Sequence, residues 1–346
     1  MSRMKSERGP SCHETASAVT RGHHDQASHR PWTRRAFAVA AVCGALGARF
    51  RTLRALGPAD EWLAIVLGSI QDGGLPQAGC YTQRCDRARN DPHYVASLGI
   101  VNPDSGSAWL VDATPDLIRQ MDLIPGAAFR ARASRRRPFE GILLTHAHIG
   151  HYLGLALLGR EGLGIEPTPC YCSSRMAEFL ANNGPWSLMV EEGRLDLRVL
   201  EPERPTLLAD DLSVTALQVP HRGEYSDTLG FVFEGPRRSL LYLPDIDRWD
   251  QWDRRVEDVV AGVDIALLDS TFYSAAELSG RDQSEVPHPL IIDTMERLGS
   301  LARSDRSIVL THLNSSNPVL DPDGPEREAV LAAGFEVARA GQIHAL

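Results

Sequence analysis

A histidine-rich segment that directly follows an apolar run is the feature that most limits what this chain can fold into. Leu143 and Leu144 lead into His146, His148 and His151, so that three histidines occur within six residues. The apolar run predicts a buried strand, and residues spaced by two lie on one side of an extended backbone. Imidazoles that converge at a strand end suit zinc, iron or manganese. The alternative is a surface loop that is merely rich in histidine.

Three further apolar runs end in the same way. His221 follows the run at 217–220, Asp245 follows the run at 240–244, and His312 follows the run at 308–311. Any one of these side chains alone could be a solvated loop residue. Four separate predicted strands that each end in His or Asp indicate instead a common metal site, with these side chains as its ligands.

The rest of the chain from 61 onward alternates strand-length apolar runs with glycine, proline and helical patterns. Strands are predicted at 63–67, 95–101, 108–112, 141–145, 212–219, 229–234, 239–243, 265–268 and 308–311. Helices are predicted at 115–121, 151–158, 173–182, 250–260, 289–298 and 325–333. Strands and helices without strict alternation predict sheets flanked by helices in layers. Gly73 and Gly74 lack the spacing of a phosphate-binding loop, and they predict a tight backbone turn near the metal.

The charge of the chain is divided unevenly. Ten Lys and Arg against three acids give residues 1–54 a charge of +7, which leaves −16 for the remainder of a chain with net charge −9. An acidic main body argues against a nucleic-acid partner, because phosphate backbones recruit basic surfaces. No apolar run reaches the about 18–20 residues needed to span a bilayer, so an integral membrane protein is not expected.

Residues 1–54 form a basic leader with a candidate export signal. Arg34 and Arg35 precede a short apolar run at 38–48, and this arrangement resembles a twin-arginine signal. The alternative is a basic extension without a targeting role. We expect a periplasmic protein if the signal is used and a cytoplasmic protein otherwise.

The segment THAHIGH at 145–151 resembles the H-x-H-x-D-H motif of the metallo-β-lactamase superfamily, and His221, Asp245 and His312 match its later ligand positions in order. The resemblance is closer still to coenzyme PQQ synthesis protein B and its relatives. It includes the segments DATPDL at 112–117, HAHIGHYLGL at 146–155, LDSTF at 268–272, PHP at 287–289 and HLNSSNP at 312–318. It implies a four-layer αββα sandwich over residues 62–346, an α/β (α+β) fold with the metal site along one edge of the sheets.

The resemblance also implies which residues bind metal. One ion would take His146, His148 and His221 with Asp245 as a further or bridging ligand, and a second would take His151, His312 and Asp245. Gly150 stands where the motif has its aspartate, and glycine supplies no ligand. We therefore expect one tightly held ion (zinc, or iron or manganese), with the second site weak or absent.

His288 and Asp269 form a candidate catalytic pair. In phosphoesterases of the superfamily a histidine near this place works with an acidic partner as a proton shuttle, and the resemblance carries that role to His288 and Asp269. An imidazole titrates near neutrality, as general acid catalysis requires. The alternative is that His288 only orients the helix after it and Asp269 only ends a strand.

Cys80 and Cys85 lie where relatives often carry a structural zinc site built from three closely spaced cysteines. This chain has two, in a polar segment, so a disulfide or free thiols are expected there rather than zinc. Cys170 and Cys172 are predicted to be alternate residues of a strand, buried as small apolar side chains.

Three functions remain open from the sequence. The first is a metal-dependent hydrolase that uses a metal-activated water, with Asp245 orienting the nucleophile and His288 protonating the leaving group. The second is an iron-dependent oxygenase of PQQ biosynthesis, since imidazole and carboxylate ligands suit Fe(II) as well as Zn(II). The third is a protein that binds or carries PQQ or a precursor on a degenerate metal site. All three act on a small molecule, with PQQ or a precursor as a candidate.

Overall fold

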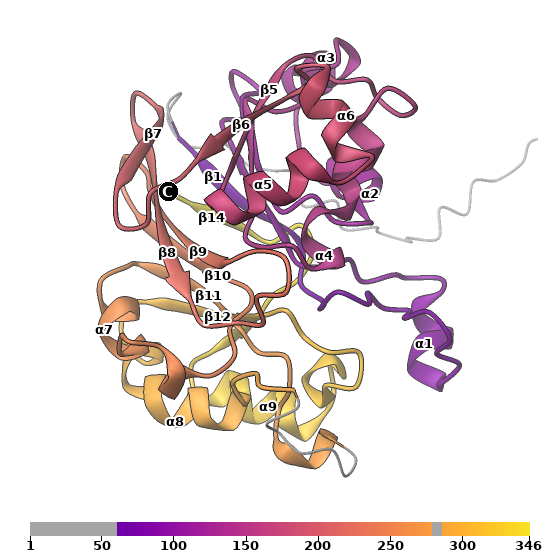
Figure 1. Ribbon diagram of the computed structural model, residues 1–346. Coiled ribbons are helices and arrows are strands. Elements are labelled where there is room, and N and C mark those ends of the chain that lie inside the picture. Colours follow the sequence, from indigo (N-terminus) through magenta and orange to yellow (C-terminus); the bar gives the residue numbers. More distant parts are fainter. Residues whose placement is uncertain (1–60, 279–285) are drawn as a thin grey trace, which may run out of the picture. The chain divides into compact units, whose positions relative to one another are not determined.

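The computed structural model describes residues 61–278 and 286–346. The predictions for the leader at 1–54 fall outside these residues. Within the described part of the chain, two seven-stranded sheets face each other and helices cover their outer faces (Figure 1). The predicted αββα sandwich is confirmed.

The first sheet has the strand order β14-β1-β2-β3-β4-β5-β6. Its strands are β1 (Leu63–Gly68), β2 (Ser97–Val101), β3 (Ala108–Val111), β4 (Gly141–Leu143), β5 (Thr168–Cys172), β6 (Leu195–Val199) and β14 (Ile343–Ala345). The helices that accompany this half are α2 (Leu117–Asp122), α3 (Ala127–Ser134), α4 (Ile149–Tyr152), the 3₁₀ helix η1 (Leu153–Leu158), α5 (Ser174–Asn182) and α6 (Trp186–Glu191). The helix α1 (Gln83–Ala88) buries Cys85 and Ala88 in the core of the second half instead.

The second sheet has the order β13-β12-β11-β10-β9-β8-β7. Its strands are β7 (Pro205–Ala209), β8 (Leu212–Val219), β9 (Thr228–Glu234), β10 (Ser239–Leu243), β11 (Ile265–Asp269), β12 (Ser307–Thr311) and β13 (Glu336–Val337). Its helices are the 3₁₀ helix η2 (Trp249–Gln251), α7 (Val256–Ala261), the 3₁₀ helix η3 (Ala275–Leu278), α8 (Ile291–Ala302), the 3₁₀ helix η5 (Pro318–Leu320) and α9 (Pro325–Ala332). None of the described helices combines the length and the apolar character that a membrane span requires.

The two faces of each central strand serve different cores. In β1, Leu63 and Ile65 pack under the helices of the first half, whereas Ala64 and Val66 pack between the sheets. Successive side chains of a strand point to opposite faces, so an unbroken apolar run is what a strand buried on both faces needs. This explains why the central strands could be predicted from apolar runs without polar alternation.

Two predicted helices differ from the structure. The helix expected at 151–158 is the end of α4 followed by the 3₁₀ helix η1. The helix expected at 250–260 is divided into η2 and α7, because the chain is extended at Trp252 and Arg255. Trp249 and Trp252 are both buried, and the indole of Trp252 donates a hydrogen bond to the carbonyl of Gln218 at 3.1 Å. Burying both indoles in the second half outweighs the local helical pattern.

Sequence patterns also missed several short elements and left the cysteines partly open. The strands β6, β7, β13 and β14 and the helices α1, α3 and α6 were not predicted as elements, and β5 was predicted only through its two cysteines. Cys170 and Cys172 do lie on alternate positions of β5 and are fully buried, as predicted. Cys80 and Cys85 form a disulfide, which decides between the alternatives for this pair.

Candidate metal centre

The predicted ligands meet at the edge where strands of both sheets end. His146 and His148 follow β4, His151 lies in α4, and His221 follows β8. Asp245 follows β10, and His312 follows β12, with β10, β11 and β12 running parallel. Loops after the carboxyl ends of neighbouring parallel strands gather at one sheet edge, which brings residues far apart in sequence together.

Asp245 is the centre of the cluster. Its Oδ2 lies 3.3 Å from Nε2 of His146, 3.2 Å from Nε2 of His221 and 3.7 Å from Nε2 of His312. The carboxylate is buried, and burial alone would raise its pKa, but the surrounding imidazoles, chiefly His221 and His312, hold the pKa of Asp245 well below its usual value. Asp245 is therefore an anion at neutral pH, as a bridging ligand must be.

Three groups of side chains among the described residues, which share some members, could each hold a metal ion. The first consists of His146, His148, His221 and Asp245, which is the set predicted for the first ion. The second consists of His151 and His312 together with Asp72, a residue that the sequence interpretation did not single out. The third consists of Asp245, Asp269, His288 and His312. In each group one ligand atom from each residue lies within 4.8 Å of the others.

Side chains behind the ligands fix which ring nitrogen faces the centre. Nδ1 of His151 donates to Oδ2 of Asp112 at 2.8 Å, and Nδ1 of His221 donates to Oδ1 of Asp247 at 2.7 Å. Such outer partners set the tautomer and orientation of metal-binding imidazoles. Nε2 of each ring is thereby left to face the cluster.

Two threonines do the same for His146 and His312. The hydroxyl of Thr145 donates to Asp112 at 2.9 Å and can then accept from Nδ1 of His146 at 3.0 Å. On the other sheet, the hydroxyl of Thr271 lies 2.7 Å from Oδ1 of Asp269 and 3.0 Å from Nδ1 of His312. The two sheets thus use the same arrangement of carboxylate, hydroxyl and imidazole.

The buried imidazoles have opposite electrostatic environments. Burial lowers the pKa of His146 well below its ordinary value. Burial also acts to lower the pKa of His151, but the charge and hydrogen bond of Asp112 overcome it and raise that pKa to about 9. The pKa of His221 rises to about 10, because Asp245 and Asp247 outweigh its burial. The carboxylates therefore supply the negative charge that a bound cation requires.

The donor set passes a direct test of fit to a metal ion. Nε2 of His146, His151 and His312 is buried in each case and has no hydrogen-bond partner among the described residues. A buried polar atom without a partner costs about 1–3 kcal/mol, so three of them in one cluster need an explanation. Divalent ions bound through these nitrogens, one in the group of His146 and one in the group of His151 and His312, would satisfy all three.

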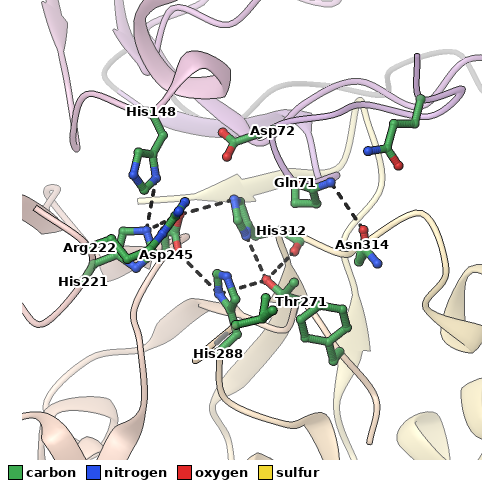
Figure 2. A pocket seen from close by; sticks show the side chains of 13 residues that line it. Gln71, Asp72, His148, His221, Arg222, Asp245, Thr271, His288, His312 and Asn314 are labelled. Atoms are coloured by element: carbon green, nitrogen blue, oxygen red, sulfur yellow. Dashed lines mark hydrogen bonds and ion pairs between the residues drawn. The ribbon is translucent and has the colours of Figure 1, made fainter. Parts of the chain in front are cut away.

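His288 and Asp269 come together as predicted. Nδ1 of His288 donates to Oδ2 of Asp269 at 2.9 Å and lies 3.4 Å from Oδ1 of Asp245. Burial acts to lower the pKa of His288, but Asp269 outweighs it and raises the pKa above its ordinary value. Figure 2 shows His288 on the pocket wall beside Asp245 and Thr271.

The cluster opens into a pocket of about 280 Å³. Besides the ligands, its wall includes polar side chains from three loops: Gln71, Gln77, Arg222 and Asn314. Phe272 and Val286 add apolar surface. Trp186, Trp249 and Trp252 do not line this pocket and are buried in the two cores instead.

The comparisons with known proteins agree with this geometry. The family described as "Beta-lactamase superfamily domain" matches residues 108–313. Coenzyme PQQ synthesis protein B of Stutzerimonas stutzeri is 30% identical over 313 residues, which cover 81% of this chain and 98% of that protein. The corresponding protein of Cupriavidus necator is 29% identical over 313 residues, covering 81% of this chain and 98% of that protein.

A solved structure shares the fold. The crystal structure of zinc-bound PqqB from Methylobacterium extorquens aligns with a TM-score of 0.65 and 24% identity, covering 82% of this chain and all of that chain. Given these matches, the chain belongs to the metallo-β-lactamase superfamily, in the family of coenzyme PQQ synthesis protein B.

Proposed function

We propose that this protein is a metal-dependent hydrolase that acts on a small molecule. The observation that carries the proposal is the convergence of His146, His148, His221 and Asp245, whose ligand atoms all lie within 4.8 Å of one another beside an open pocket. When bound there, a divalent ion of zinc, iron or manganese supplies Lewis-acid activation of water at neutral pH.

The chain's own residues have separate tasks in this proposal. Asp245 stays ionised, lies between the imidazoles and would orient the attacking water. His288 holds one proton on Nδ1 toward Asp269, which leaves Nε2 as the position from which a proton can reach the leaving group. The raised pKa of His288 keeps that proton available near neutral pH.

The relatives support PQQ chemistry as a second candidate function, either oxygenation of a PQQ precursor or binding of PQQ. The identity to coenzyme PQQ synthesis protein B extends over 98% of the relative's length, which supports PQQ or one of its precursors as the small molecule. An iron-dependent oxygenase, or a protein that binds PQQ without turnover, would use the same histidines and carboxylates.

One set of measurements separates these functions. Protein purified without added metal is analysed for bound metal by mass spectrometry, and then tested on ester and phosphodiester substrates, for dioxygen uptake with a PQQ precursor, and for PQQ binding. Metal-dependent hydrolysis supports the hydrolase. Substrate-coupled dioxygen uptake, or tight PQQ binding without turnover, would replace it with the second function. Folded protein that takes up no zinc, iron or manganese would overturn both.

We also propose that the protein works in the periplasm. The paired arginines Arg34 and Arg35 before an apolar run support twin-arginine export, and the disulfide between Cys80 and Cys85 is of a kind that persists in oxidising compartments. Cell fractionation tests this: the protein should be periplasmic, and replacing both arginines with lysine should retain it in the cytoplasm. A wild-type protein found only in the cytoplasm would contradict the proposal.

A further inference from the structure

The carboxylate of Asp72 occupies the space next to Gly150, where the superfamily motif has its own aspartate. We propose that Asp72, from the loop after β1, replaces that missing ligand and completes a second metal site with His151 and His312. The inference rests on the metal binding in the proposed function, but it does not depend on hydrolysis.

The side chain of Asp72 fills the space that a side chain at position 150 would need. A Cβ atom built on Gly150 would lie 2.2 Å from Oδ1 of Asp72 and 2.7 Å from its Cα. The backbone N–H of Gly150 instead donates a hydrogen bond to Oδ1 of Asp72 at 3.0 Å. No side chain fits at position 150 while Asp72 is in place, so glycine there and aspartate at 72 form a matched pair.

Asp72 faces the two imidazoles that the first ion does not use. Its Oδ1 lies 3.5 Å from Nε2 of His151, and one ligand atom each from Asp72, His151 and His312 lies within 4.8 Å of the others. Nε2 of His151 and of His312 are the buried atoms without hydrogen-bond partners described above. These two buried nitrogens without partners indicate a bound ligand, and this observation does not depend on Asp72.

The loop that carries Asp72 is held firmly beside His312. The N–H of Gln71 donates to the carbonyl of Leu313 at 3.0 Å, and the N–H of Leu313 donates to the carbonyl of Ser69 at 2.8 Å. Asp72 then sits in a turn closed by a bond from the N–H of Gly74 to the carbonyl of Gln71 at 2.9 Å, and Gly74 has a φ of +65° that favours glycine. Figure 2 shows Asp72 on the pocket wall near His148 and His312.

If Asp72 is a ligand, two metal ions are expected instead of one. The expectation of a single tight ion rested on the lack of a carboxylate at position 150. With Asp72 in place, the second group has two imidazoles and its own carboxylate, and Asp245 lies 4.0 Å from His151 and 3.7 Å from His312 as a shared anion. This is a donor set of the kind that binds zinc, iron or manganese.

The test is the number of metal ions in reloaded protein. Metal is removed with a chelator, zinc is added back, unbound zinc is removed by gel filtration, and bound zinc is counted by mass spectrometry. The wild type should hold two equivalents. Asp72→Asn and Asp72→Ala should each hold one, with affinity at the second site lowered by at least about 10–100-fold. Asp104→Asn, which changes an exposed aspartate in a remote turn, is the matched control and should hold two.

A substitution at position 150 makes the test specific. Gly150→Ala should reduce stability and lower zinc binding at the second site, because its Cβ would meet both Oδ1 and the backbone Cα of Asp72. Spin coupling between two Mn(II) ions in electron paramagnetic resonance should appear and disappear with the second equivalent. One equivalent in the wild type, or two in Asp72→Asn, would overturn the inference and leave the hydrolase proposal standing. Zinc bound by no variant would remove the proposed function itself.

Discussion

His151 donates its Nδ1 proton to Oδ2 of Asp112 at 2.8 Å, and both side chains are completely buried. Asp112 also accepts from the backbone N–H and the hydroxyl of Thr145. One carboxylate at the end of β3 thereby positions a candidate ligand and the residue that orients another. Asp112 has a φ of +63°, an unusual backbone for a residue other than glycine, and such strain is tolerated where surrounding contacts require it.

Asp112→Ala should lower both stability and metal affinity. The change breaks a buried pair by removing the carboxylate that holds both His151 and Thr145, which typically costs about 3–5 kcal/mol. Metal affinity should fall by about 10–100-fold, because His151 loses the partner that orients it. Urea unfolding and zinc titration measure the two effects. Asp112→Asn keeps the shape and should be milder; equal stability of Asp112→Ala and the wild type would contradict this account.

His146→Ala should reduce metal binding and also destabilise the metal-loaded protein. His146 is buried and supplies one of four ligand atoms to the first group, and a metal that binds only the folded state adds its binding energy to folding. Thermal unfolding with and without zinc measures this: zinc should raise the melting temperature of the wild type much more than that of the variant. His93→Ala, which alters an exposed histidine outside the cluster, should behave as the wild type.

His288→Gln should retain the metal but slow the chemistry. Nδ1 of His288 is bonded to Asp269, and His288 is not a member of the group of His146, His148, His221 and Asp245, so zinc held by that group should not change. Loss of a general acid should lower kcat by about 10²–10⁴-fold with a smaller effect on KM. Metal analysis and steady-state kinetics on the best substrate check the division of roles. Release of the metal by His288→Gln would show that this residue is a ligand.

His344 should make the protein less stable as the pH falls below neutrality. Burial lowers the pKa of His344 in the folded protein, with Arg238 adding to this effect and Glu336 opposing it. The unfolded chain therefore binds a proton at His344 first, and stability is lost as the pH drops below about 6.5, by at most about 1.4 kcal/mol per pH unit.

His344→Gln isolates this contribution. Urea unfolding of chelator-treated protein between pH 7.5 and 5.5 should show a shallower loss of stability in the variant than in the wild type. The cluster histidines titrate in both proteins, so their effect cancels in the difference. Identical pH profiles would exclude His344 as a source of acid sensitivity.

The sequence predicted the ligands better than the groups that support them. His221, Asp245 and His312 were found because each directly follows an apolar run, and that local signal survives without knowledge of the fold. Asp112 and Asp247 were not recognised as partners of His151 and His221, since hydrogen bonds between loops of different strands leave no periodic pattern. The short strands β13 and β14 were missed for a related reason: two or three residues are too few to show a period.

Asp72 was not found by the rule that found the others. Three residues separate it from the end of β1, whereas His312 is the first residue after β12. No histidine lies next to Asp72 in the sequence, and the carboxylate of the second site was expected within the histidine motif at 145–151. Only the distance from Asp72 to Gly150 shows that the two positions share one space.

The division of β1 between two cores has a consequence for the edge of the sheet that carries Asp72. Sliding this strand by a single residue would turn Leu63 and Ile65 toward the opposite sheet and Ala64 and Val66 toward the helices, which no core of fixed shape can accept. The register of β1 is therefore fixed by its side-chain packing as well as by its backbone hydrogen bonds. The loop after β1 begins at a fixed position, so the carboxylate of Asp72, four residues after the strand ends, can be positioned without a helix to carry it.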